Sequence, residues 1–381
     1  MKPVQIIIGG DVCPIGRNGA LFKAADPAAC VRDLLCAFKA ADLCVANLEC
    51  PLIDHESPIP KTGPVLGAEP ECLAGIIASG VRVLGLANNH ILDHGAAGLE
   101  NTLRVCAKAG IRTFGAGRNL AQAREILVVP AGLLRVGLLG VAEQEWSIAT
   151  EHSPGANPVD LIDCVRNIGE RRKDFDFLVV LLHGGVESYR FPSPRLREVC
   201  RFLVEQGAGL VVCQHSHAAG CYERYGRGHI IYGQGNFIFD SPDNPGSWQE
   251  GFLIQLSVMP DDFSSDWQPI PYLQSDAMPG ARRMPPAREK TFLQGLAERS
   301  KAIEEKDFVS RSWERFCRAQ QHSFMSATLG HGRVLRRLNR HGRVVKHFLG
   351  DETLRTMRNC VACEAHREVL LTVLDQYLDK P

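Results

Sequence analysis

Short apolar runs alternate with amphipathic stretches from Val4 to about Ile254. The runs have the length of strands, and the stretches carry apolar residues at the three- and four-residue spacing of helices. Strands are expected at 4–8, 43–46, 81–86, 134–139, 177–182, 210–213 and 230–232, and helices at 29–40, 69–79, 96–109, 159–172 and 194–206. This alternation predicts an α/β fold with βα units around a largely buried sheet.

The pattern changes after Val258. Six prolines fall between Pro260 and Pro286, which predicts a linker or a wrapping segment over 259–286. The chain reads as helical from about Ala287 onward. We therefore expect a domain over 1–258 and a helical extension over 287–381.

Charge and hydropathy limit the classes of partner. Lys+Arg and Asp+Glu each number 43, so no overall field favours nucleic acid as a partner. No segment approaches the roughly 20 apolar residues of a membrane span, and the first apolar run is too short for a signal peptide. The sequence therefore predicts a soluble, cytoplasmic protein without a transmembrane segment. Most of its 14 cysteines are expected to be buried free thiols.

A basic run, Arg333 to Lys346, lies in the expected helical extension. The simpler interpretation is a solvated helix face, and the alternative is a surface that binds an anionic ligand or polymer.

Polar residues with metal-ligand chemistry follow five of the expected strands. Ligands of α/β proteins bind beyond the carboxyl ends of the strands, because the connecting loops converge there. The candidates at these ends are Asp11, Glu49, the group Asn88, Asn89, His90 and Asp93, then His183, and finally His215 with His217. Singly, the Gly-Asp pair is ordinary turn chemistry and a histidine is more often structural. Together the five sites indicate a metal centre.

The ordered motifs GGD, ADLCVANLECPL, LANNHILDHGAAGL, LLHGGVESY, QHSHAAGCYERY and IIYGQGNFIFD resemble those of the CapA, or PGA-cap, family. That family is linked to poly-gamma-glutamate capsule synthesis and belongs to the calcineurin-like metallophosphoesterase superfamily. The resemblance covers roughly Val4 to Asp240. It implies a layered α/β/β/α sandwich, here with a C-terminal helical extension.

The resemblance also implies two metal ions bridged by Glu49. Asp11 and His217 would complete one site, and Asn89, His183 and His215 would complete the other. His90 would lie beside the metals as a general acid or oxyanion stabiliser, with Asp93 orienting it. Lys61 and Asn88 are the candidates for contact with an anionic substrate, and a solvated loop lysine is the alternative for Lys61.

The chain departs from the superfamily pattern at two positions. Cys13 stands where the Asp-x-His motif has its histidine, and Glu49 replaces the usual bridging aspartate. Cys13 is either a soft metal ligand or a buried small side chain. We expect divalent ions, Mn, Zn or Fe, with one bound tightly and the second more weakly.

A centre of this kind suits hydrolysis of a phosphoester, because two cations activate water and neutralise phosphoryl charge. The sequence therefore predicts a metal-dependent phosphoesterase-type hydrolase that serves capsule or surface-polymer synthesis and associates with the polymer-synthesis machinery. Two alternatives remain open, a non-hydrolytic polymer-binding component of assembly and a metal-dependent gamma-glutamyl amide hydrolase.

Overall fold

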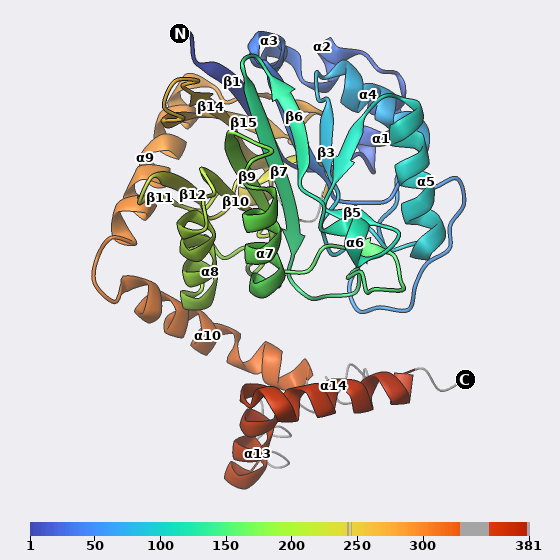
Figure 1. Cartoon of the computed structure of the whole chain (residues 1–381), viewed down its shortest axis with the longest axis vertical. Helices are drawn as coiled ribbons and strands as arrows, with labels where there is room; N and C mark the ends of the chain where they lie inside the picture. Colours follow the sequence, from blue (N-terminus) through green and yellow to red (C-terminus); the bar gives the residue numbers. More distant parts are fainter. Residues whose placement is uncertain (242–243, 245, 328–349, 379–381) are drawn as a thin grey trace. The chain divides into compact units, whose positions relative to one another are not determined.

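The computed structural model describes residues 1–241, 244, 246–327 and 350–378. Contacts between residues divide the chain into two compact units, Met1–Ser310 and Arg311–Pro381. Two large β-sheets form the centre of the first unit (Figure 1).

The first sheet has the strand order β16-β15-β14-β1-β2-β3-β4, and β13 pairs with β1. Strands β1 to β4 and β13 pair in parallel, whereas β14, β15 and β16 are antiparallel additions. Their bounds are β1 Val4–Cys13, β2 Leu43–Leu48, β3 Val83–Gly85, β4 Arg112–Phe114, β13 Asn236–Phe239, β14 Glu250–Val258, β15 Ser265–Gln274 and β16 Ala281–Arg283.

The second sheet has the order β11-β12-β10-β9-β7-β6. Its bounds are β6 Leu127–Ala131, β7 Leu134–Ala142, β9 Phe177–His183, β10 Leu210–Gln214, β11 Tyr222–Tyr225 and β12 Gly228–Ile231. The antiparallel pair β11 and β12 is the hairpin that the glycines at 226 and 228 predict. Two short strands, β5 Ala116–Gly117 and β8 Gly155–Ala156, pair separately.

Helices cover the outer faces of the two sheets (Figure 1). The described helices of the first unit are α1 Arg17–Lys23, α2 Pro27–Cys30, α3 Leu35–Ala40, α4 Leu73–Ala78, α5 Gly95–Lys108, α6 Leu120–Ala123, α7 Leu161–Arg171, α8 Pro194–Glu205 and α9 Pro286–Ala302, of which α9 packs on the inter-sheet core. Three 3-10 turns, η1 Arg32–Leu34, η2 Pro70–Cys72 and η3 Ser247–Gln249, complete it. Helix α10, Phe308–Ala327, continues into the second unit, which also holds α13 Asp351–Ala362 and α14 Glu364–Leu378.

Alternation along the buried strands separates the layers. Ile6 and Ile8 of β1 point into the core between the two sheets, while Ile7 points to the helices on the outer face of the first sheet. On β9, Val179 faces the inter-sheet core and Val180 faces the layer of α7 and α8. Successive strand residues point to opposite faces, so fully apolar strands supply two cores at once. The α/β/β/α sandwich that the resemblance implies is confirmed.

The expected helix over 29–40 is interrupted. It consists of α2, the short turn η1 and α3. Arg32 has a φ of +42°, which a right-handed helix cannot accommodate. The other four expected helices and the seven expected strands are present with shifted ends.

The Pro-rich segment 259–286 is not a linker. Strand β15 pairs with β14 along its whole length, and β16 then covers only Tyr272 to Gln274. Pro269 and Pro271 lie in the part of β15 that β16 leaves as a sheet edge, where proline is tolerated. Helix α9 follows and buries Phe292 and Leu296 in the inter-sheet core, so the first unit extends beyond residue 258.

The basic run from Arg333 to Lys346 lies outside the residues that the structure describes. Among those it does describe, none of the helices has the length and apolar character needed to cross a bilayer.

Gly10 marks a close backbone approach that holds β13 against β1. A Cβ atom at Gly10 would lie 2.0 Å from the carbonyl oxygen of Gly235. We expect Gly10→Ala to destabilise the protein by about 1–3 kcal/mol, because one strand must move to remove the overlap. Thermal unfolding measures this as a lower Tm.

Gly169→Ala is the matched control, because nothing lies within 4 Å of the added Cβ in helix α7. It should leave stability unchanged or raise it by roughly 0.5–1 kcal/mol. Equal Tm values for the two variants would contradict the close approach.

Candidate metal centre

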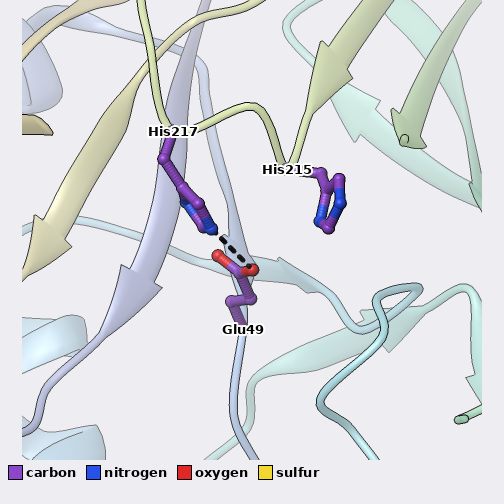
Figure 2. A group of neighbouring side chains, drawn as sticks. All are labelled: Glu49, His215 and His217. Carbon is purple, nitrogen blue, oxygen red and sulfur yellow. Dashed lines mark ion pairs between the residues drawn. The ribbon is translucent and has the colours of Figure 1, made fainter. Parts of the chain in front are cut away.

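Side chains from both sheets converge where the parallel strands end. Asp11 lies near the end of β1 and His183 is the last residue of β9. Glu49 directly follows β2, while His215 and His217 follow β10. All five are buried. Figure 2 shows the His217 imidazole directed at the Glu49 carboxylate, with His215 beside them.

Glu49 has the most unusual environment. Its side chain is fully buried, and neither carboxylate oxygen accepts a hydrogen bond within the described part of the chain. Burial raises the pKa of Glu49 to about 8. A buried carboxylate of this kind is costly unless a cation compensates its charge.

Asp11 is the second buried acid of the cluster. Its Oδ1 accepts a hydrogen bond of 2.8 Å from Nδ2 of Asn47, and its Oδ2 accepts one of 3.2 Å from the backbone N–H of His215. Burial and then the charge of Glu49 raise the pKa of Asp11 to about 7. The charge of Glu49 therefore opposes the ionisation of Asp11 in the absence of a cation.

The three histidines supply neutral imidazoles. The Nε2 atoms of His183 and His217 lie 3.3 Å and 3.7 Å from Oε1 of Glu49. Burial lowers the pKa of His183 to about 4 and that of His215 to about 3, and it also lowers the pKa of His217. These imidazoles are uncharged at neutral pH, so they do not compensate the carboxylates. Neutral imidazole is the form that binds metals.

His215 and His217 lie in a loop after β10, with a backbone conformation that is not that of a strand. Strand β10 ends at Gln214, and the two histidines have φ values of +91° and +53°. A non-glycine residue at positive φ costs about 1–3 kcal/mol and persists where the surrounding structure enforces it. The loop geometry, rather than an extended chain, turns both rings toward Glu49.

The closest ligand atoms form two groups that share Glu49. One contains Asp11, Glu49 and His183, and the other contains Glu49, His215 and His217. Within each group the ligand atoms lie within 4.8 Å of one another. Carboxylates and neutral imidazoles in this arrangement fit divalent metal binding, and Glu49 is the natural shared ligand. In this grouping His183 lies with Asp11 and His217 lies with His215, whereas the resemblance implies His217 with Asp11 and His183 with His215.

Asn89 brings an amide to the same place. Its Oδ1 lies 3.0 Å from Nε2 of His183, and its Nδ2 donates a hydrogen bond of 2.8 Å to Oε2 of Glu145. His215 Nδ1 lies 3.2 Å from the same His183 nitrogen. The expected set of Asn89, His183 and His215 therefore comes together around one atom, although Asn89 is absent from the groups of acids and imidazoles.

His90 and Asp93 form a separate chain beside the ligands. Nδ1 of His90 lies 2.6 Å from Oδ2 of Asp93, whose Oδ1 lies 2.5 Å from Nζ of Lys61. The Lys61 side chain is only 2% exposed, so it is an internal ion-pair partner rather than a solvated loop lysine. Burial would raise the pKa of Asp93, but hydrogen bonds from His90 and Lys61 outweigh it and hold that pKa below its usual value.

Asn88, another expected site residue, makes its hydrogen bonds within the protein. Nδ2 of Asn88 donates to Oδ1 of Asn47 and to the carbonyl of Leu48, and its Oδ1 accepts from the backbone of His90. These contacts hold the buried Asn88 within the protein, and its contact with a substrate stays a prediction.

Cys13 lies in the hydrophobic cluster on the outer side of the first sheet and belongs to neither ligand group. Burial and the adjacent thiol of Cys50 hold the pKa of Cys13 well above its ordinary value. A neutral thiol is a poor metal ligand. The burial of Cys13 in this cluster therefore favours a small packed side chain over a soft metal ligand.

Glu145 is the site residue that the sequence pattern did not single out. It lies three residues after the end of β7, whose apolar run predicts a strand. The rule that ligands gather at strand ends would have found it. Asn236, from β13, is a second supporting residue, since its Oδ1 lies 2.8 Å from Nδ1 of His217.

A protein-family model described as "Bacterial capsule synthesis protein PGA_cap" matches residues 5–241, well over half of the chain. The chain is 33% identical to the "Capsule biosynthesis protein CapA" of Bacillus anthracis over 46% of its own length and 44% of that protein. It is 28% identical to the "PGA biosynthesis protein CapA" of Bacillus subtilis over 57% of each. The chain thus spans about half the length of the curated relatives it matches.

Among solved structures, the chain is similar to a phosphatase from Mycoplasma pneumoniae, with a TM-score of 0.47 and 13% identity. The match covers 73% of this chain and 96% of that one. A likeness this distant does not indicate a shared activity.

The environment of Glu49 makes a prediction for the metal-free protein. The folded state holds its proton up to about pH 8, whereas the unfolded chain releases it near the ordinary value of 4.5. Stability from this group is therefore complete at low pH and is lost as pH rises from 4.5 to 8. In EDTA, Glu49→Gln should be more stable than the parent at pH 8, on the order of 1–3 kcal/mol, because it removes a buried unpartnered charge.

Thermal unfolding between pH 5 and pH 8 measures this difference, which should shrink toward pH 5. The matched control is Glu151→Gln, because the side chain of Glu151 is 85% exposed and its loss should change nothing. A Glu49→Gln protein that is less stable than the parent at pH 8 would contradict the environment described.

Proposed function

Because the chain belongs to the bacterial capsule synthesis protein PGA_cap family, we propose that it is a metal-dependent hydrolase of the phosphoesterase type that serves capsule or poly-gamma-glutamate synthesis. One observation carries the proposal. Glu49 is fully buried, its two oxygens lack hydrogen bonds within the described residues, and neutral histidines surround it. A divalent cation is the partner that this arrangement lacks.

Two cations would share Glu49. We keep the assignment that the resemblance implies, in which Asp11 and His217 would hold one of them with Glu49, and Asn89, His183 and His215 would hold the other. Two contacts support it over the alternative grouping: Nδ1 of His217 lies 3.8 Å from Oδ2 of Asp11, and both Asn89 and His215 lie within 3.2 Å of Nε2 of His183. Nitrogen and oxygen ligands of this kind suit Mn, Zn or Fe. When bound, such ions lower the pKa of water and neutralise charge on a phosphoryl oxygen.

His90 would be the proton-transfer residue of the reaction. Its Nδ1 is engaged by Asp93 at 2.6 Å, which leaves Nε2 as the nitrogen that can act on a leaving oxygen. The ion pair of Asp93 with Lys61 keeps that carboxylate charged and fixed. Lys61 therefore acts through Asp93 and does not bind substrate itself.

The substrate class follows from the charge that the centre could neutralise. An anionic phosphoester, small or at the end of a polymer, suits two cations with an adjacent proton-transfer group. The names of the capsule-synthesis relatives support association with polymer-synthesis machinery. A gamma-glutamyl amide is the alternative substrate, and a non-hydrolytic role in polymer assembly is the alternative function.

We expect His90→Ala to keep its metal but to lose about 10²–10⁴-fold in turnover, because it removes a positioned proton-transfer group and no metal ligand. Glu49→Gln should lose both metal and activity. Metal analysis of the purified proteins and hydrolysis of a panel of phosphomonoesters, phosphodiesters and gamma-glutamyl amides measure these outcomes.

The matched control is His152→Ala, because the His152 side chain is 93% exposed. Full activity of His90→Ala would remove His90 from the reaction. A metal-loaded parent that cleaves no phosphoester or amide would favour the assembly role over catalysis.

The two affinities should differ. The cation that Asp11 and His217 would share with Glu49 lacks a further protein ligand where the superfamily pattern has a histidine, because Cys13 is buried in the hydrophobic cluster. Calorimetric titration of the chelator-treated protein with Mn²⁺ should therefore give one tight and one weaker site.

Cys13→Ala serves as the control for this titration and should leave both affinities unchanged. Two equally tight sites would contradict the assignment, and a weaker site that disappears in Cys13→Ala would restore the thiol as a ligand.

A further inference from the structure

Glu145 contacts two of the residues that would hold the same cation. Its Oε2 accepts a hydrogen bond of 2.8 Å from Nδ2 of Asn89. Its Oε1 lies 3.7 Å from Nε2 of His215. The Glu145 side chain is 40% exposed, so it lies at the rim of the centre rather than among the buried ligands.

The hydrogen bond to Asn89 decides which end of the amide faces the centre. An asparagine side chain can present either its oxygen or its NH₂ group to a given neighbour, and only the oxygen can bind a cation. Because a carboxylate accepts hydrogen bonds but does not donate them, Glu145 selects the orientation with Nδ2 outward. Oδ1 of Asn89 then points inward, 3.0 Å from Nε2 of His183.

Glu145 also orients the imidazole of His215. Nδ1 of His215 faces Nε2 of His183 at 3.2 Å, so its Nε2 is the nitrogen that points toward Glu145. A carboxylate on the far side of an imidazole favours a proton on that nitrogen and leaves the other free for a metal. At 3.7 Å the attraction is electrostatic rather than a direct hydrogen bond.

We propose that Glu145 is the positioning residue of this metal site, orienting Asn89 and His215 as ligands of the cation that they share with His183. This role rests on the proposed metal centre. Glu145 is not itself a ligand in the arrangement described, because its carboxylate faces the outer atoms of both side chains.

The rim offers two carboxylates for comparison. Glu143 uses its Oε2 to accept a hydrogen bond of 3.0 Å from the backbone of Gly185, and Glu187 is exposed. Neither makes a hydrogen bond to a ligand side chain within the described residues. If the rim acted only by attracting cations, removing any of these three charges would have a similar effect.

The test is a double-mutant cycle read by Mn²⁺ titration calorimetry on the full chain. Glu145→Ala should weaken the tighter of the two Mn²⁺ affinities about 10- to 100-fold, as is typical when an outer carboxylate of a metal site is lost. Glu143→Ala and Glu187→Ala should leave that affinity unchanged. Glu145→Gln keeps an oxygen that accepts from Asn89, so its loss should be smaller than that of Glu145→Ala.

The second arm uses Asn89→Asp, whose carboxylate presents an oxygen in either orientation. In that background Glu145→Ala should weaken Mn²⁺ binding less than it does in the parent, because only the orientation of His215 still depends on Glu145. Coupling of this kind is the sign of one residue acting through the other. An equal loss from Glu145→Ala in both backgrounds would overturn the positioning role in favour of a general charge effect.

The same titration distinguishes this inference from the proposed function. A parent protein that binds no divalent cation overturns both. A parent that binds Mn²⁺ as tightly as the Glu145→Ala variant overturns only the role of Glu145. Thermal unfolding of each variant in EDTA should match the parent, and a large loss of stability there would show that Glu145 supports the fold and not the metal site.

Discussion

The burial of two acids between the ends of two sheets is the constraint on which the site depends. Glu49 and Asp11 are buried, and burial raises the pKa of both. The histidines around them are neutral and do not compensate a carboxylate charge. A divalent cation would therefore stabilise the ionised form of both acids and would couple metal binding to the stability of the fold.

The backbone around these acids is correspondingly constrained. Gly10 lets β1 and β13 approach so closely that a methyl group would overlap the carbonyl of Gly235. On the other sheet, His215 and His217 adopt positive φ values that other residues of their kind avoid. Strain and close contact occur together at the site because ligands from two separate sheets must meet within a few ångströms.

The centre has two functional layers with different electrostatics. The inner layer consists of acids and neutral imidazoles. Only a bound cation would compensate the charge of its ionised acids. Beside it, Lys61, Asp93 and His90 form a chain that compensates its own charge, since Lys61 pairs with Asp93. Because this chain compensates its own charge, the position of His90, the proposed proton-transfer residue, does not depend on a bound metal.

Local sequence pattern determined the strands, most of the helices and the candidate ligands at the strand ends. Apolar runs of strand length ended in polar residues, and the carboxyl ends of parallel strands meet at one edge, so Asp11, Glu49 and the histidines were predictable from period and position alone. The same reasoning failed where pairing with a segment distant in sequence decides the secondary structure. Residues 265–274 form β15 because they pair with the edge of β14, although the prolines of this segment predict a linker or a wrapping segment.

Tertiary structure alone decided the roles of the remaining polar residues. Lys61 became an internal ion-pair partner because its loop closes over Asp93, and Cys13 became a core residue because its side chain packs on the outer side of the first sheet. Glu145 gained its place through Asn89, a contact between residues 56 positions apart. Residue type and spacing identify which groups can bind a metal, but the direction in which each side chain points depends on packing between segments that the sequence does not place together.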